Sequence, residues 1–203
     1  MLTEKEISRY SRHLLLPEIG ISGQEKLKAA KVLVVGAGGL GCPVLMYLAA
    51  AGVGKIGIVD FDTVDETNLQ RQVLFDVNDV GRSKAESAKQ KLSKQNPHIE
   101  IESSQVKLTT QNALDLFSKY DLVVDGTDNF SARYMVNDAC VLSGRTLVSG
   151  SVFRFQGQVS VFNFQKKNSA LPTAACFLRL RHPDPFSPAP KRACWVCCRD
   201  LSE

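Results

Sequence analysis

One apolar run covers residues 31–35, and a second ends just before Asp60, with a helix-like segment between them. A continuous apolar run of about five residues favours a strand that is buried on both faces. The pattern therefore predicts a strand, a helix that continues to about residue 51, and a second strand. Together they form one βαβ unit, around which the rest of the chain is organised.

Helical and extended patterns alternate along the rest of the chain. Helical patterns cover residues 2–13, 23–30, 81–94, 112–118 and 131–143. The first begins with Thr3 and Glu6 in the spacing of a capping box. Extended patterns cover residues 99–106, 121–124, 145–150 and 156–164. The last of these alternates between apolar and polar residues, which predicts an exposed edge strand or an antiparallel strand.

The turn after the first strand contains Gly36, Gly38 and Gly41 in the spacing G-x-G-x-x-G. Gly36 permits the tight turn, Gly38 lets a phosphate approach the backbone, and Gly41 lets helix and strand pack closely. The free N–H groups of the helix N-terminus then face an anion, and Asp60 is placed to accept hydrogen bonds from ribose hydroxyls. We therefore predict a nucleotide site, and the alternative is a turn whose glycines serve packing alone.

These elements predict an α/β fold of the Rossmann-like, doubly wound type. We expect a mainly parallel sheet with helices on both faces, an N-terminal helical extension and a truncated antiparallel continuation. The expected segments are the helical extension over residues 1–30, a nucleotide-binding α/β domain over 31–168 and an irregular tail over 169–203.

Composition narrows the class of protein. A chain of 203 residues can bury one substantial core. The net charge of +4 is mild, and basic residues are interspersed with acidic ones, so we expect no nucleic-acid partner. No run approaches the roughly 18 apolar residues of a membrane span, and the N-terminus is too charged for a signal peptide. We expect a cytoplasmic protein without a membrane partner.

The polar segment of residues 61–72 follows the second predicted strand and shows no periodicity. Ligands bind at the carboxyl ends of parallel strands, so polar side chains in this segment are candidates for ligand contact. The candidates are Asn68, Gln70 and Arg71.

Lys84 lies in the first turn of the predicted helix 81–94. A cation there opposes the helix dipole, at a cost of about a few tenths of a kcal/mol. A phosphate that faces Lys84 would explain its position, and the alternative is a surface lysine.

Asp125 and Asp128 follow the predicted strand 121–124, and a doubly wound sheet brings them near the glycine turn. Asp128 is a candidate magnesium ligand, because this hard cation binds carboxylate oxygen and shares itself with substrate phosphates. The alternative, which is compatible with the first role, is an N-cap for the predicted helix 131–143.

Several motifs together resemble one family of enzymes. They are R-Y-S-R-H, G-A-G-G-L-G, V-D-F-D-T-V-D-E-T-N-L-Q-R-Q, G-R-S-K-A-E-S-A, D-G-T-D-N-F and S-G-S-V-F-R-F-Q-G-Q-V-S-V-F, which run from about residue 9 to 166. The chain resembles the MoeB/ThiF/HesA adenylylating enzymes, relatives of the ubiquitin-activating enzymes. A nicotinamide dehydrogenase shares the glycine turn but not the N-L-Q-R-Q, helix-start lysine and T-D-N motifs.

The resemblance implies a substrate, cofactors and site residues. It implies that ATP and Mg²⁺ adenylylate the C-terminal carboxylate of a small ubiquitin-like sulfur-carrier protein that ends in Gly-Gly, in molybdopterin or thiamine synthesis. The implied catalytic residues are Arg12, Arg71, Lys84 and Asp128, the last also binding magnesium. The implied nucleotide contacts are Gly36, Gly38, Gly39, Gly41, Asp60, Asp62, Asn68, Leu69, Gln70, Arg71, Lys84, Asp128 and Asn129.

Arg12 matches a family arginine that reaches across the interface of a homodimer into the partner's site. The residues alone leave a second explanation open, in which Arg9 and Arg12 lie on a solvated helix face. Attack by a carboxylate needs charge neutralisation and alignment rather than a general base, because the nucleophile is already deprotonated. Two other functions remain: a non-catalytic nucleotide-binding remnant, and an NAD-dependent oxidoreductase.

The resemblance stops at about residue 169, where the chain becomes dense in Pro, Arg and Cys. If the last nucleotide of each codon is read with the first two of the next, residues 169–184 can spell G-P-T-Y-R-C-L-F-P-T-P-P-P-P-G. At the same offset, residues 193–200 can spell V-L-G-V-L-P-G, and family members carry both stretches. We therefore interpret the tail as out of frame, through a frameshift or a sequencing error.

This tail contains four of the six cysteines. Cys194 and Cys197 have the spacing of half a zinc site, and members of the family carry two C-x-x-C pairs that bind a structural zinc. A second pair is missing from this chain, so we expect no zinc.

Overall fold

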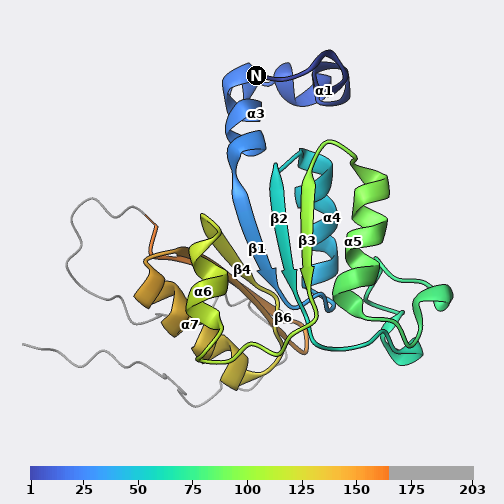
Figure 1. Ribbon diagram of the computed structural model, residues 1–203, viewed down its shortest axis with the longest axis vertical. Helices are drawn as coiled ribbons and strands as arrows, with labels where there is room; N and C mark the ends of the chain where they lie inside the picture. Colours follow the sequence, from blue (N-terminus) through green and yellow to red (C-terminus); the bar gives the residue numbers. More distant parts are fainter. Residues whose placement is uncertain (165–203) are drawn as a thin grey trace, which may run out of the picture.

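The computed structural model describes residues 1–164, which form one mixed six-stranded sheet with helices on both faces (Figure 1). The strand order is β3-β2-β1-β4-β5-β6. The strands are β1 (Lys31–Val35), β2 (Lys55–Val59), β3 (Glu100–Ser104), β4 (Leu122–Asp125), β5 (Thr146–Phe153) and β6 (Gln156–Phe162). The first five are parallel, and β6 pairs antiparallel with β5. The predicted fold class is confirmed.

Two layers of helices enclose the sheet. The helices are α1 (Glu4–Arg9), α2 (Ser11–Leu14), α3 (Gly20–Ala29), α4 (Gly41–Ala51), α5 (Lys84–Gln95), α6 (Ala113–Ser118) and α7 (Phe130–Ser143). Helices α4 and α5 pack on one face through a core that includes Val34 and Ile58, and α6 and α7 pack on the other through Leu33 and Val35. Successive residues of β1 point to opposite faces, so a strand covered on both sides is apolar throughout.

The chain changes direction across the sheet between β1 and β4. From β1 it continues through β2 to β3 on one side, and then crosses to β4 on the other side of β1. In such sheets ligands bind at this switch point, beyond the carboxyl ends of the strands. The glycine turn follows β1 at this place.

The N-terminal extension differs from its prediction. The capping box of Thr3 and Glu6 is present, but the expected single helix is broken at Tyr10 into α1 and α2. Tyr10 is buried against Gly52, and its hydroxyl accepts a hydrogen bond from the Asn96 side chain at 2.8 Å. Contacts distant in sequence therefore set the break, and the extension sits at the end of α4 that lies away from the glycine turn (Figure 1).

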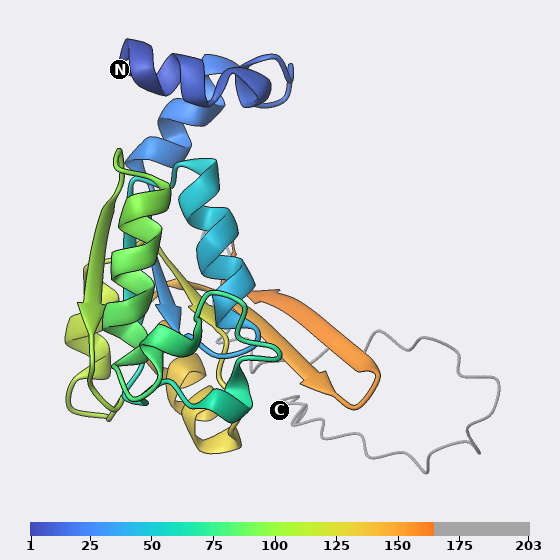
Figure 2. The ribbon, with the colours of Figure 1, turned by 90° about the vertical axis from the view of Figure 1, so that its right-hand side faces the viewer.

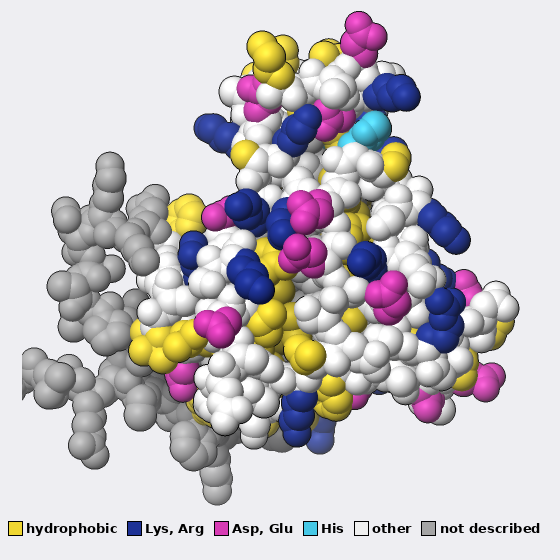
Figure 3. Space-filling model, in the orientation of Figure 1, with side chains coloured by type: hydrophobic (Ala, Val, Ile, Leu, Met, Phe, Trp, Pro, Cys, Tyr) yellow, Lys and Arg dark blue, Asp and Glu magenta, His cyan; other side chains and the backbone are white. Residues whose placement is uncertain are grey.

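The β5–β6 hairpin projects beyond helix α4 (Figure 2). Its last strand alternates as predicted, with Val159 and Val161 exposed and their neighbours partly covered. On the face of the molecule in Figure 3, Lys and Arg side chains alternate with Asp and Glu and form no stripe of one sign. Among the described residues, no helix combines the length and apolarity that a membrane crossing requires.

Candidate functional site

Close approach of three backbone segments shapes the glycine turn. Gly36 has φ +91°, and a Cβ there would meet the carbonyl of Gly126 at 3.1 Å. A Cβ on Gly41 would overlap the Gly36 carbonyl oxygen. No residue with a Cβ fits at these two positions. The glycine spacing in the sequence therefore follows from close packing between β1, α4 and the end of β4.

The N-terminus of α4 leaves backbone donors available. Within residues 1–164, the N–H groups of Gly38, Gly39 and Leu40 make no hydrogen bond. The first N–H groups of a helix carry a partial positive charge and bind anions. The turn can therefore receive a phosphate.

Asp60 is buried at the end of β2 and fixes the rim of the turn. Its Oδ2 accepts a hydrogen bond from the Ala37 N–H at 2.7 Å, and its Oδ1 accepts one from the Asp62 N–H at 2.9 Å. Burial raises the pKa of Asp60, while these two N–H groups and the nearby Lys84 oppose the rise. The carboxylate thus has the place that a ribose-binding acid needs, and it also supports the turn itself.

The loop between β2 and α5 brings Arg71 over the turn. A short 3-10 helix, η1 (Glu66–Asn68), lets Arg71 fold back, and its Nη2 donates to the Asn68 Oδ1 at 3.1 Å. The Cγ and Cδ of Arg71 lie 3.4 Å from where a Cβ of Gly39 would be. The exposed guanidinium is therefore close to the free N–H groups of the helix.

Gln72, rather than Gln70, faces the turn. Gln70 is exposed and makes only a 3.5 Å contact with the Thr67 carbonyl, and Leu69 packs into the core beneath α4 and α5. Gln72 is 3% exposed, and its Nε2 lies 3.9 Å from where a Cβ of Gly38 would be. Sequence reasoning missed Gln72, although Asn68, Arg71 and Gln72 at i, i+3 and i+4 share one face of a helical turn.

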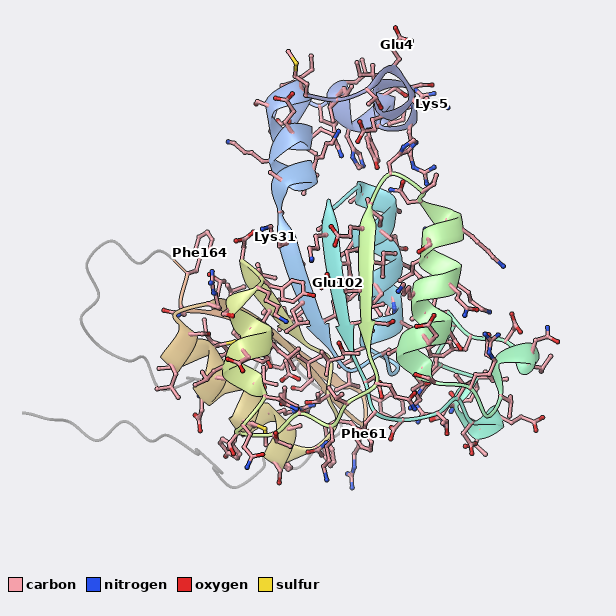
Figure 4. All side chains as sticks on the ribbon, in the orientation of Figure 1. Glu4, Lys5, Lys31, Phe61, Glu102 and Phe164 are labelled. Atoms are coloured by element: carbon pink, nitrogen blue, oxygen red, sulfur yellow. The ribbon has the colours of Figure 1, made fainter. Side chains whose placement is uncertain are left out.

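Lys84 is buried and paired, so the alternative of a surface lysine is wrong. It is 6% exposed in the first turn of α5, and its Nζ lies 3.2 Å from the Oδ2 of Asp62. Since the Asp62 N–H binds Asp60, the lysine is connected to the rim of the turn. Phe61, between these two acids, marks this edge of the sheet, opposite Glu4 and Lys5 at the other end of the molecule (Figure 4).

Asp128 lies on the loop that follows β4, at the same edge of the sheet. This loop is held at Thr127, directly before Asp128: Asp125 Oδ1 accepts from the Thr127 N–H and hydroxyl, and Arg133 donates twice to the Thr127 carbonyl. The predicted alternative that Asp128 caps the next helix is wrong, because Asn129 is the N-cap of α7 and accepts from the Ala132 N–H. Asp128 itself is exposed.

The described side chains could bind a magnesium ion only together with the phosphates of a substrate. Among residues 1–164, no group of three or more His, Cys, Asp or Glu side chains could hold a metal ion. Magnesium is usually bound by one or two carboxylates together with substrate phosphates, so a single exposed carboxylate beside the turn suits it.

One predicted residue, Arg12, lies away from this edge. Arg12 is exposed in α2, next to His13, whose Nδ1 contacts Gln24, and Gln24 binds the last residue of α4. Helix α4 has 11 residues, so about 16 Å separate its two ends.

Cys42 and Cys140 are buried, and burial raises their pKa to about 11 and about 12, so both remain thiols at neutral pH. The cysteines of the tail and the frame interpretation lie outside the described residues.

Comparison with known proteins identifies the family. The model of the ThiF family matches residues 10–195. The chain belongs to the ThiF family. It is 60% identical over 161 residues to "Probable adenylyltransferase/sulfurtransferase MoeZ" of Mycobacterium tuberculosis, covering 79% of this chain and 41% of that protein. It is 53% identical to "Sulfur carrier protein adenylyltransferase" of Thermus thermophilus, covering 79% of this chain and 59% of that protein.

A solved structure of E. coli MccB with ATP matches the fold with a TM-score of 0.69 and 32% identity, over 78% of this chain and 48% of that one. The chain thus spans roughly half the length of these relatives. The family match extends to residue 195, beyond the point near residue 169 where the resemblance was expected to stop.

Proposed function

We propose that this chain binds ATP at the glycine turn and adenylylates the C-terminal carboxylate of a small ubiquitin-like sulfur-carrier protein that ends in Gly-Gly. One observation supports it most: Arg71 lies along Gly39 while the Lys84–Asp62–Asp60 chain and the Asp128 loop border the same turn. The relatives named above are adenylyltransferases, which agrees with this proposal.

The reaction needs positioning and charge rather than a base. A carboxylate oxygen of the carrier bonds to the α-phosphorus, and the bond from that phosphorus to the bridging oxygen breaks to release pyrophosphate. Negative charge accumulates on the phosphates, and fixed cations and N–H groups stabilise it. Arg71, Lys84 and the α4 N-terminus supply these groups, and no histidine is required.

Predicted residues that border the turn have the following proposed roles. The N–H groups around Gly39 hold phosphate, and Asp60 binds the ribose. Asn68, Arg71 and Lys84 contact the triphosphate, and Asn129 lies beside the nucleotide. Asp128 holds Mg²⁺, which neutralises phosphate charge when bound.

Arg12 is proposed to act in the site of a second copy, within a homodimer. The length of α4 separates it from the glycine turn of its own chain, which is farther than its side chain extends. This proposal explains an exposed arginine without an acidic partner in the described part of the chain.

Pyrophosphate exchange tests the function. The chain, supplied with ATP, Mg²⁺ and a Gly-Gly-ending carrier, should incorporate labelled pyrophosphate into ATP, and a carrier that lacks its last glycine should not support exchange. Nucleotide binding without exchange would indicate the non-catalytic remnant instead. Reading the encoding DNA across the codon of Ser169 tests the frame interpretation separately, since one nucleotide change there should restore a long open frame.

A comparison of ATP and NAD binding distinguishes the proposed function from the oxidoreductase alternative. A ligand that binds only the folded state raises the melting temperature. ATP with Mg²⁺ should therefore raise it and NAD should not, whereas the reverse result would favour the oxidoreductase.

A further inference from the structure

Gln72 is a buried polar residue that no role above uses. Its side chain is 3% exposed beside the glycine turn, and its Nε2 donates to the Asn68 Oδ1 at 3.2 Å. Its own Oε1 is buried and has no hydrogen-bond partner among the described residues. A buried amide with one end paired and the other unpaired costs free energy, so its placement needs an explanation.

Donor chemistry fixes how the neighbouring Asn68 is turned. A guanidinium can only donate, so the Asn68 atom that faces Arg71 at 3.1 Å has to be the oxygen. Gln72 contacts the same oxygen, and it therefore presents its NH₂ group there. This orientation follows from the arginine and does not depend on how either amide is assigned.

Two donors on one oxygen leave the other half of the Asn68 amide free. Within residues 1–164, the Nδ2 of Asn68 makes no hydrogen bond. An NH₂ group donates, and the proposed ligand of this turn carries phosphate oxygens, which accept. If Asn68 were rotated by 180°, its carbonyl oxygen would instead face those oxygens and repel them.

We propose that Gln72 is a positioning residue of the nucleotide site, which holds the Asn68 amide with its NH₂ group turned outward for a phosphate. The inference rests on the proposed function and deepens it. Gln72 does not contact the phosphate itself: it acts through Asn68, together with Arg71. The unpaired Oε1 is the consequence, because the amide has to present its nitrogen to Asn68.

The test measures ATP binding by calorimetry in the presence of Mg²⁺. Gln72→Met keeps the size of the side chain and removes its donor, and it should weaken ATP binding about five-fold, as for one neutral hydrogen bond. Arg71 still holds Asn68 in this variant, so the loss is partial. Gln111→Met, in an exposed turn before α6, is the matched control and should bind as the unmodified chain does.

A double-mutant cycle separates positioning from general support of the loop. In the Asn68→Ala background, Gln72→Met should cause no further loss of ATP affinity, because the group that it positions is gone. Additive losses in the two variants would overturn the inference, as would unchanged affinity in Gln72→Met itself.

A second variant covers the case in which Gln72→Met fails to fold. Asn68→Asp keeps the oxygen that Arg71 and Gln72 contact and replaces the outward NH₂ with an oxygen, so ATP affinity should fall more than ten-fold with an unchanged melting temperature. Binding equal to the unmodified chain would overturn the orientation. If the unmodified chain binds no ATP at all, the proposed function itself fails. That result differs from a failure of the Gln72 inference, in which the unmodified chain binds ATP and the variants bind it equally well.

Discussion

The two ends of helix α4 differ in how their unpaired backbone groups are satisfied. At the C-terminal end, the Asn96 side chain donates to the Ala49 carbonyl at 2.7 Å, and the Gln24 side chain donates to the Ala51 carbonyl at 2.8 Å. Tyr10 packs against Gly52, which ends the helix with φ +81°. At the N-terminal end, the N–H groups of Gly38, Gly39 and Leu40 have no partner in the described part of the chain.

Every helix leaves about four carbonyls and four N–H groups without intrahelical partners. Here the N-terminal extension and the end of α5 satisfy the carbonyl end, whereas the amide end stays open beside Arg71. The closed end stabilises the fold and the open end can bind an anion, so changes at the two ends should have separable effects.

The largest expected effect is at the open end. Arg71→Ala should reduce carrier-dependent pyrophosphate exchange at least about 100-fold, because a cation that stabilises the charge of the transition state is lost. The side chain is exposed, so the melting temperature should stay within a degree or two. Arg9→Ala, at the closed end, is the control and should leave exchange unchanged; equal losses in both variants would remove the distinction between the ends.

Asn96→Ala should give the next largest effect, on stability alone. Asn96 is fully buried, and its loss leaves the Ala49 carbonyl and the Tyr10 hydroxyl without their donor. We expect a loss of about 2 kcal/mol in the free energy of unfolding, measured in urea. Asn78→Ala, an exposed position, should cost much less, and a drop in ATP affinity for folded Asn96→Ala would contradict the separation.

The closed end should also lose stability in acid through Glu6. Burial alone would raise the pKa of Glu6, but hydrogen bonds from Lys28 and Thr3 lower it to about 2. A lowered pKa stabilises the fold at pH values above the ordinary value of 4.5, and this contribution is lost as the pH falls from 4.5 towards 2.

Glu6→Gln isolates this contribution. Its free energy of unfolding should lie about 1–2 kcal/mol below that of the unmodified chain at pH 7, and the difference should vanish near pH 2. A difference that is constant over this range would show that the Glu6 charge is not involved.

The smallest expected effect is that of Tyr10→Phe. The ring still packs against Gly52, and Asn96 keeps its bond to the Ala49 carbonyl, so only the hydroxyl acceptor is lost. We expect a loss of about 0.5–1 kcal/mol in urea unfolding and no change in ATP binding. A larger cost than that of Asn96→Ala would place the stabilisation in the ring hydroxyl instead.

Local patterns predicted the framework of the fold and the glycine turn. Strands buried on both faces read as continuous apolar runs, and the spacing of Gly36 and Gly41 follows from close packing, which any sequence of this fold has to satisfy. The antiparallel edge strand was visible because apolar and polar residues alternate along β6, although its exposed face carries Val159 and Val161 rather than the polar side chains.

Features set by distant partners could not be predicted. Lys84 is buried because Asp62, 22 residues earlier, lies beside it, and the helix break at Tyr10 depends on Gly52 and Asn96. The choice of Gln72 over Gln70 depends on the helical turn at Asn68, in a loop without periodicity. Asn129 rather than Asp128 caps α7 because the helix begins at Phe130, and the N-cap is the residue directly before the helix.

The position of Arg12 has a consequence for how the activity would depend on concentration. It lies at the closed end of α4, so no single copy can supply it to its own glycine turn. If Arg12 serves the reaction, turnover per molecule would fall on dilution once the copies separate. Adding an Arg71→Ala chain to the diluted protein would then restore turnover. The nucleotide site of this variant is impaired, but its Arg12 can still act in the site of an unmodified copy.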